Sequence, residues 1–190
     1  MQWLYASFFP AIWIAFLLYW QVKARHTKAT QRLEPVASRI VRSLVFLTAI
    51  ALLMLPRIPL PWLYRQFLPS GQWPFFLGAV LTSAGLLFAV WAREYLGANW
   101  SHSVTIKQDH QLIINGPYAL VRHPIYTGLI AGILGSVIAL AQLRGLIAFV
   151  LFSLALWAKL RIEEEWMRHQ FGASYEAYSR RVAAVVPFIL

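Results

Sequence analysis

Long apolar stretches constrain this 190-residue chain more than any other feature. A helix that crosses a bilayer needs roughly 20 mainly apolar residues, and the chain contains five stretches near that length. They run over residues 3–22, 40–55, 73–92, 125–143 and 145–160. The second and fifth are short unless Arg42 and Lys159 extend to the lipid headgroups. Composition agrees, since 13% of the residues are charged, where a soluble domain has about 25%.

We therefore predict an all-α integral membrane protein, one membrane domain over residues 1–190 with five transmembrane helices. Residues 142–145 leave room only for a tight turn, so the fourth and fifth helices form an antiparallel hairpin. Gly128, Gly132 and Gly135 give the fourth helix a face of small residues, which allows another helix to pack closely. The first stretch has no basic region before it and is too long for a cleaved signal peptide.

The distribution of charge predicts the orientation. All basic residues except Arg57, Arg65 and Arg144 lie on the same side of the predicted spans, as do all acidic residues and all histidines. Loops rich in Lys and Arg stay in the cytoplasm. The N-terminus is then outside, and the C-terminus and any active site are cytoplasmic. The net charge of +10 reflects this topology and attraction to anionic membrane lipids, so no nucleic-acid partner is expected.

Side chains that bind metals give no clear site. The chain has no cysteine, which excludes disulfides and thiolate chemistry. His102, His110 and His123 have spacings that match no zinc site. We predict no metal.

Two predicted cytoplasmic segments, residues 93–124 and 161–190, are rich in functional groups. The first contains a turn at 115–117 and short apolar pieces, 104–106 and 112–114, that suggest extended chain. In the second, the fifth helix continues beyond the bilayer and ends at Gly172. A short amphipathic helix with two tyrosines follows.

Taken singly, these side chains also suit a purely structural role. Three pairs are spaced for surface ion pairs along a helix: Lys159 with Glu163, Arg161 with Glu165, and Glu164 with Arg168. Three aromatic residues suit interfacial anchoring: Trp100, Tyr118 and Tyr126.

Together, the segments resemble the isoprenylcysteine carboxyl methyltransferase family, including prokaryotic members of unassigned substrate. The matching residues are NWSHSV (99–104), HQLIINGPYALVRHPIYTG (110–128), RIEEE (161–165), FGASYEAYSRRV (171–182) and PFI (187–189). They cover roughly the C-terminal half of the chain. RVAAVVP (181–187) departs from the family, which usually has proline soon after Arg-Val.

The resemblance implies a site for S-adenosylmethionine, formed by the loop before the fourth helix and by the C-terminal helices. The cofactor residues it implies are His110, Gln111, Leu112, Ile113, Tyr118, His123, Pro124, Ile125, Tyr126, Glu163 and Glu164. A basic residue one turn before the glutamate would hold the acceptor carboxylate, and Arg122 could assist it. Two registers remain open, one pairing Lys159 with Glu163 and the other Arg161 with Glu165. They differ chemically because lysine does not match the bidentate geometry of arginine.

The residue types suit methyl transfer at a membrane surface. Aromatic faces and carboxylates attract the sulfonium and the ribose of this cofactor. A carboxylate acceptor needs no general base, and the reaction depends on alignment and exclusion of water. We predict a multi-pass protein of a prokaryotic inner membrane, which methylates a carboxylate of a lipidic or amphipathic acceptor.

Three other functions are considered. An N-methyltransferase for a phospholipid amine or another small molecule would have to remove a proton from its acceptor and would not need an arginine clamp. A membrane reductase using NADPH is usually longer and has more spans. In a non-catalytic membrane protein, the same side chains would be anchors and ion pairs. The identity of the acceptor and the oligomeric state are left open by the residues.

Overall fold

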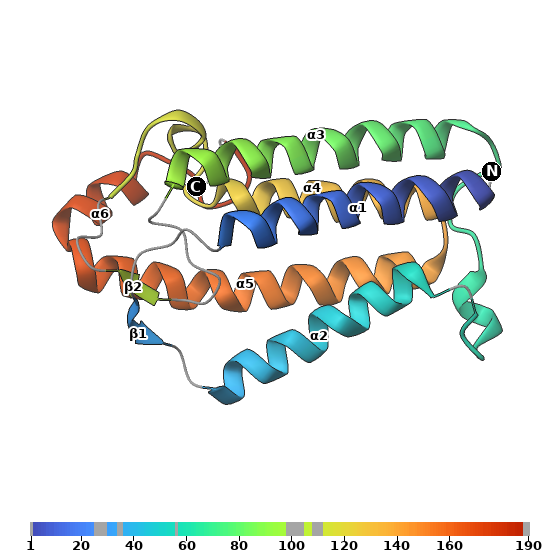
Figure 1. Ribbon diagram of the computed structural model, residues 1–190, viewed down its shortest axis with the longest axis horizontal. Coiled ribbons are helices and arrows are strands. Elements are labelled where there is room, and N and C mark those ends of the chain that lie inside the picture. Colours follow the sequence, from blue (N-terminus) through green and yellow to red (C-terminus); the bar gives the residue numbers. More distant parts are fainter. Residues whose placement is uncertain are drawn as a thin grey trace.

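The computed structural model describes residues 2–24, 30–33, 36–55, 57–97, 105–107 and 112–187. Long helices lie side by side and place most short elements at the two ends of the bundle (Figure 1). In chain order the elements are α1 (Gln2–Ala24), β1 (Thr30–Leu33), α2 (Val36–Met54), η1 (Pro61–Tyr64), α3 (Trp73–Leu96), β2 (Thr105–Lys107), η3 (Gly116–Ala119), α4 (Pro124–Leu140), α5 (Leu143–Phe171) and α6 (Ala173–Ser179).

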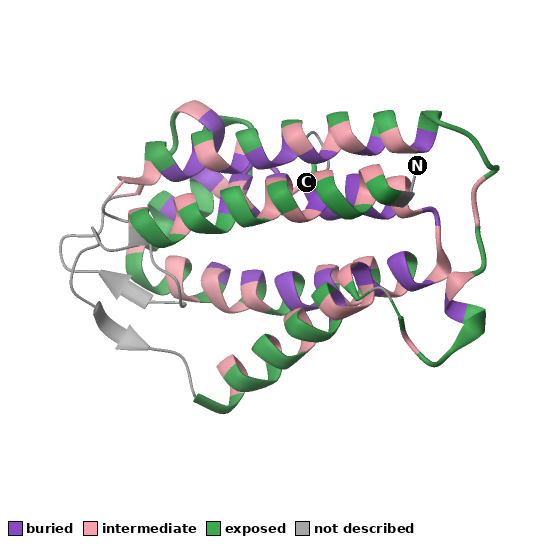
Figure 2. Ribbon diagram, turned by 45° about the vertical axis from the view of Figure 1, so that its right-hand side comes forward, coloured by how far each residue is buried: buried purple, intermediate pink, exposed green. Residues whose placement is uncertain are grey.

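The helices have the lengths and surfaces of an integral membrane protein. Among the described residues, α1, α2, α3 and α5 are long and apolar enough to cross a membrane. Exposed residues follow one another along these helices (Figure 2). Many of them are large and apolar, among them Leu17, Leu44 and Leu87. α4 has 17 residues, or about 25 Å of helix, whereas the hydrocarbon layer is about 30 Å thick. The helical membrane class is confirmed, and the count of five spans stays a prediction.

The predicted hairpin between α4 and α5 is confirmed, with shifted boundaries. α4 ends at Leu140 rather than at residue 143, because Ala141 adopts a left-handed conformation with φ of 54°. α5 begins at Leu143. Main-chain hydrogen bonds from Phe67 to Ala141 and from Leu143 to Arg65 fix this turn against the loop before α3.

The predicted close helix approach is also confirmed, and its partner is α3. Glycines face glycines across the contact, Gly78 opposite Gly135 and Gly85 opposite Gly128. A Cβ added at Gly135 would lie 2.5 Å from the main-chain oxygen of Gly78. The two backbones therefore touch, and α3 fixes the position of α4.

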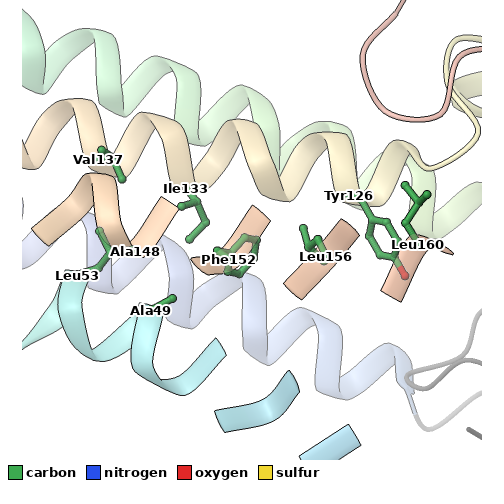
Figure 3. Packing of buried hydrophobic residues seen from close by; sticks show 9 residues of the cluster. All are labelled: Ala49, Leu53, Tyr126, Ile133, Val137, Ala148, Phe152, Leu156 and Leu160. Carbon is green, nitrogen blue, oxygen red and sulfur yellow. The ribbon is translucent and has the colours of Figure 1, made fainter. Parts of the chain in front are cut away.

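A second set of contacts joins α2, α4 and α5 in an apolar core. Figure 3 shows Leu53 and Ala49 of α2 facing Ala148 and Phe152 of α5. The row continues along α5 to Leu156 and Leu160 and ends beside Tyr126 of α4. α2 begins at residue 36 rather than 40, so Arg42, which was expected to extend to the lipid headgroups, lies further from the start of the helix than predicted.

The end of α5 and the tyrosines of α6 lie where the sequence analysis predicted them. α5 continues past its apolar part and ends at Phe171, followed by Gly172 with φ of 49°, a value that favours glycine. α6 then carries the two predicted tyrosines. Extended chain was expected at 104–106; within the described residues, β2 pairs there with β1 in an antiparallel manner. Residues 112–114 form no regular element.

Candidate functional site

Three parts of the chain meet at the end of the bundle where α4 begins (Figure 1). They are the segment 115–127 around η3 and the first turn of α4, the second half of α5, and the residues in and after α6. Their side chains form one group, which we call the carboxylate cluster. Its members are Arg122, His123, Tyr126, Lys159, Glu163, Glu164 and Tyr175.

The start of α4 presents two rings on one face. His123 is the N-cap, and Tyr126 follows three residues later, so both side chains lie on the same side of the helix. The rings are stacked, with centroids 5.4 Å apart and planes 6° apart. Pro124 is the first residue of the helix, where its missing N–H group costs nothing.

Glu163 lies against these rings. The hydroxyl of Tyr126 donates a 2.6 Å hydrogen bond to its Oε1. His123 Nδ1 lies 3.6 Å from its Oε2, and Lys159 Nζ lies 3.8 Å from its Oε1. The Lys159 ammonium also lies over the Tyr126 ring, 5.4 Å from its centroid. The Glu163 side chain keeps 25% of its surface exposed, so it can contact a ligand.

Glu164 points into the protein and connects the three parts of the chain. Its side chain is 6% exposed. Arg122 donates to both of its oxygens, over 2.8 and 3.2 Å. Tyr175 donates from α6 over 2.8 Å, and Arg168 lies 3.4 Å away. These partners satisfy the buried carboxylate, which gives it an internal structural role.

His123 has a carboxylate at each ring nitrogen, because its Nε2 lies 2.9 Å from Glu164 and its Nδ1 faces Glu163. A neutral imidazole has a single N–H donor, so only the protonated ring donates to both carboxylates. Burial by itself would lower the pKa of His123, but the two glutamates outweigh it and raise that pKa above its usual value. Burial opposes ionisation of Glu164, yet bonds from His123 and Arg122 lower its pKa to about 2. The cluster therefore favours an imidazolium between two carboxylates.

This arrangement predicts a pH-dependent stability. A group whose pKa is raised by folding stabilises the protein fully below its unfolded pKa, about 6.5 for histidine. That contribution is lost as the pH rises through the higher folded pKa. We therefore measure the unfolding temperature in detergent while the pH is raised above the unfolded pKa of histidine. We expect it to fall more in the wild type than in His123→Gln. The nearby ionisable groups, Lys159, Glu163, Glu164 and Tyr175, are the same in both proteins. Parallel curves for the two proteins would contradict a charged His123.

The segment after α6 completes the site, and the sequence analysis did not identify its role. The main-chain N–H groups of Arg122 and His123 donate to the carbonyls of Ala183 and Ala184. Thr127 Oγ1 donates to the carbonyl of Val185 over 2.6 Å. We call residues 182–187 the C-terminal segment. It contains all but the first residue of the stretch that departs from the family pattern, and no local motif indicates its distant partner.

Arg122 also donates hydrogen bonds to main-chain carbonyls between α6 and the C-terminal segment, in addition to those that it donates to Glu164. One terminal nitrogen, Nη1, donates to the carbonyls of Ser179 and Val182. With the two bonds to Glu164, the guanidinium is used within the protein. The structure thus shows the Arg122 side chain bound to groups of the protein, and the assistance that it was expected to give an acceptor stays a prediction.

The two pairings that the sequence left open, Lys159 with Glu163 and Arg161 with Glu165, lie on different faces of α5. Lys159 and Glu163 face the carboxylate cluster. Arg161 is exposed, and its guanidinium lies over the Trp157 ring, 5.7 Å from the centroid. Glu165 is exposed as well and lies 4.0 Å from His169. The α5 helix turns residues 161 and 165 away from the face that carries 159 and 163, so Arg161 is not brought to the site.

The other expected cofactor residues lie nearby or outside the described chain. Tyr118 and Tyr126 are 8% and 7% exposed, too buried for interfacial anchors. Tyr178 donates to the carbonyl of Tyr118, which joins α6 to η3. Pro124 is buried, whereas Leu112, Ile113 and Ile125 are half-buried. His110, Gln111, His102 and Trp100 lie outside the described residues.

The sequence profile of phospholipid methyltransferases matches residues 73–174, more than half of the chain and most of the site. The chain belongs to the phospholipid methyltransferase family. It is 31% identical to the protein-S-isoprenylcysteine O-methyltransferase of Schizosaccharomyces pombe, over 76% of this chain and 59% of the relative. It is 27% identical to the probable protein-S-isoprenylcysteine O-methyltransferase of Oryza sativa subsp. indica, over 83% of this chain and 84% of the relative.

These relatives confirm that this phospholipid methyltransferase family member resembles isoprenylcysteine carboxyl methyltransferases. The chain spans 59% of the length of the S. pombe relative. A solved structure of the eukaryotic intramembrane Ras methyltransferase ICMT, without a monobody, is 27% identical with a TM-score of 0.47. That match covers 80% of this chain and 52% of the solved chain.

Proposed function

We propose that this protein transfers a methyl group from S-adenosylmethionine to a carboxylate of a lipidic acceptor. The main support is the partly exposed Glu163 beside the stacked His123 and Tyr126, with Lys159 on the same side. The relatives named as isoprenylcysteine O-methyltransferases support the same reaction class.

The described side chains fit this cofactor. A carboxylate that keeps part of its surface exposed can accept hydrogen bonds from ribose hydroxyls or attract a sulfonium. The electron-rich face of Tyr126 suits a cation as well, as the position of Lys159 over it illustrates. Among the expected cofactor residues, Glu163 is therefore assigned a direct contact, and Glu164 positions His123.

When bound, S-adenosylmethionine supplies an electrophilic methyl carbon whose bond to the acceptor oxygen forms as its bond to sulfur breaks, leaving the electron pair on sulfur. The carboxylate cluster needs to move no proton for this reaction. Its tasks are to hold the reactants in line and to exclude water. The buried Tyr118 and Tyr126 and the C-terminal segment surround the site for this purpose.

The orientation in the membrane belongs to the same proposal. The carboxylate cluster, the start of α2 and the ends of α1 and α3 lie at one end of the bundle (Figure 1). Most basic residues are at this end, so we place it in the cytoplasm of a prokaryotic cell, with the N-terminus outside. The cofactor then arrives from the cytoplasm and the acceptor from the bilayer.

Binding of S-adenosylhomocysteine, the demethylated product, gives a direct test. We expect calorimetry to detect binding to the wild type, weakened about tenfold or more in Glu163→Gln, because a hydrogen bond to a charged group is lost. Glu165→Gln is the matched control, since Glu165 is its exposed neighbour, and its affinity should not change. Failure of the wild type to bind, or binding of NADPH instead, would contradict the proposed function.

The family profile also favours a second candidate, N-methylation of a phospholipid amine. Lipid extracts incubated with labelled methyl donor separate the two products. A methyl ester releases its label in mild base, whereas an N-methyl group keeps it. Base-stable label would replace our proposal with N-methylation.

A further inference from the structure

The cations nearest the carboxylate cluster are already engaged. Arg122 is held by Glu164 and by main-chain carbonyls, and Arg161 points away from the site. Lys159 remains beside the cluster, where Glu163 attracts it. An acceptor carboxylate therefore meets one suitable cation on α5, and that cation already has an anionic neighbour.

α2 brings two further cations towards this region. In its C-terminal half, Ala49 is buried in the core, and the ring of Phe46 lies 5.0 Å from that of Phe152. Helical steps of three or four residues continue the same face towards the start of α2. They reach Arg42 and then Arg39. Because α2 and α5 run in opposite directions, these arginines lie towards the end of α5 that carries Lys159 (Figure 1).

Arg39 and Arg42 are less exposed than the two residues between them. Ile40 and Val41, between them, are 54% and 61% exposed, whereas Arg39 and Arg42 are half-buried. Within the described residues, Arg39 Nε is buried and donates no hydrogen bond. Such a donor is unusual in a folded protein and indicates a missing partner.

α2 diverges from α5 at this end of the bundle (Figures 1 and 2). Its buried residues, Ala49 and Leu53, both lie in the half that stays close to α5. The half that contains the arginines has no buried residue. The axes of α2 and α5 thus move apart towards the start of α2, the half of the helix that carries Arg39 and Arg42.

We propose that Arg39 and Arg42 form, together with Lys159, the binding site for the anionic head of the acceptor, whose apolar chain lies between α2 and α5. Charged side chains within a membrane helix are costly and mark functional sites. The planar guanidinium groups can bind a carboxylate through two hydrogen bonds each.

This inference rests on the proposed methyl transfer and adds the residues that recognise the head of the acceptor. Three cations attract a carboxylate head and repel an ammonium head in surroundings of low dielectric constant. The site therefore selects a carboxylate-headed amphiphile over an amine-headed one, and Arg39 and Arg42 determine this specificity.

The first test uses the wild type alone. Three ligands share an N-acetylated S-isoprenylcysteine framework: the free carboxylate, its primary amide, and an analogue with an aminomethyl group in place of the carboxylate. We expect calorimetry in detergent to show the carboxylate binding about tenfold more tightly than the amide, because a charge-assisted contact is lost. The amine should bind more weakly still. Equal affinities for carboxylate and amine would overturn the inference.

The second test replaces the arginines. In Arg39→Gln and Arg42→Gln, we expect the acceptor KM to rise about tenfold each, with unchanged affinity for S-adenosylhomocysteine. The amide should bind these variants as well as it binds the wild type, which separates a charge contact from a folding defect. Arg57→Gln, an exposed arginine at the other end of the bundle, is the control.

The outcomes distinguish the two proposals. A wild type that neither binds S-adenosylhomocysteine nor transfers a methyl group ends the proposed function. An active wild type whose arginine variants keep the same acceptor KM ends only the inference. Loss of S-adenosylhomocysteine affinity in both variants would also overturn it, since the arginines would then serve the cofactor or the fold.

Discussion

Replacing Glu164 with alanine is expected to lower the free energy of unfolding by about 3–5 kcal/mol, because it leaves buried charges without a counter-ion. Its partner Arg122 has a side chain that is 11% exposed. The substitution also removes the acceptor for Tyr175 and for His123 Nε2. Denaturant unfolding of the detergent-solubilised protein measures this effect. Activity should be lost with it, since His123 is no longer held.

The neighbouring glutamate provides the control for this measurement. Glu165 has a side chain that is 70% exposed, and Glu165→Ala should change the free energy of unfolding by less than about 0.5 kcal/mol. Glu164→Gln keeps the shape and one acceptor oxygen, so it should fall between the two. A loss below about 1 kcal/mol for Glu164→Ala would show that the carboxylate cluster does not hold α4, α5 and α6 together.

Replacing Gly135 with alanine is expected to lower the free energy of unfolding by about 3 kcal/mol, because the contact between α3 and α4 has no room for a methyl group. The added Cβ would lie 2.5 Å from the Gly78 oxygen and 2.6 Å from the Thr82 nitrogen. Backbone atoms cannot rotate away as side-chain ends can. The helices must therefore separate, and thermal unfolding in detergent measures the cost.

Gly132→Ala is the matched control on the same helix. The nearest atoms to its added Cβ belong to the side chains of Leu86 and Trp13, at 3.3 Å. These can shift by the small distance required, so we expect a loss below about 1 kcal/mol. Equal losses at Gly132 and Gly135 would mean that backbone contact is not what limits substitution in α4.

The features that could be predicted from sequence depend on local pattern or on motif. Apolar length indicated the helices, and the glycine spacing indicated a closely packed face on α4. The end of α5 at Phe171 followed from Gly172. The family motifs predicted that the start of α4 lies against the glutamates of α5, and the structure shows this contact.

Other features depend on contacts that no local pattern encodes. The pairing of the C-terminal segment with Arg122 and His123 joins residues about sixty positions apart through main-chain atoms, which leave no signature in side-chain sequence. Arg42 was expected to extend to the lipid headgroups, because hydropathy does not show which way a helix face turns. The tilt of α2 away from α5 depends on packing at its other end, around Ala49 and Phe46.

The C-terminal segment also sets an order of events during synthesis. Arg122 and His123 obtain their main-chain partners from Ala183 and Ala184, which the ribosome adds after all the helices α1 to α6. A nascent chain with its helices already inserted therefore lacks these two main-chain hydrogen bonds. The start of α4 therefore obtains these two main-chain partners only once translation has passed Ala184.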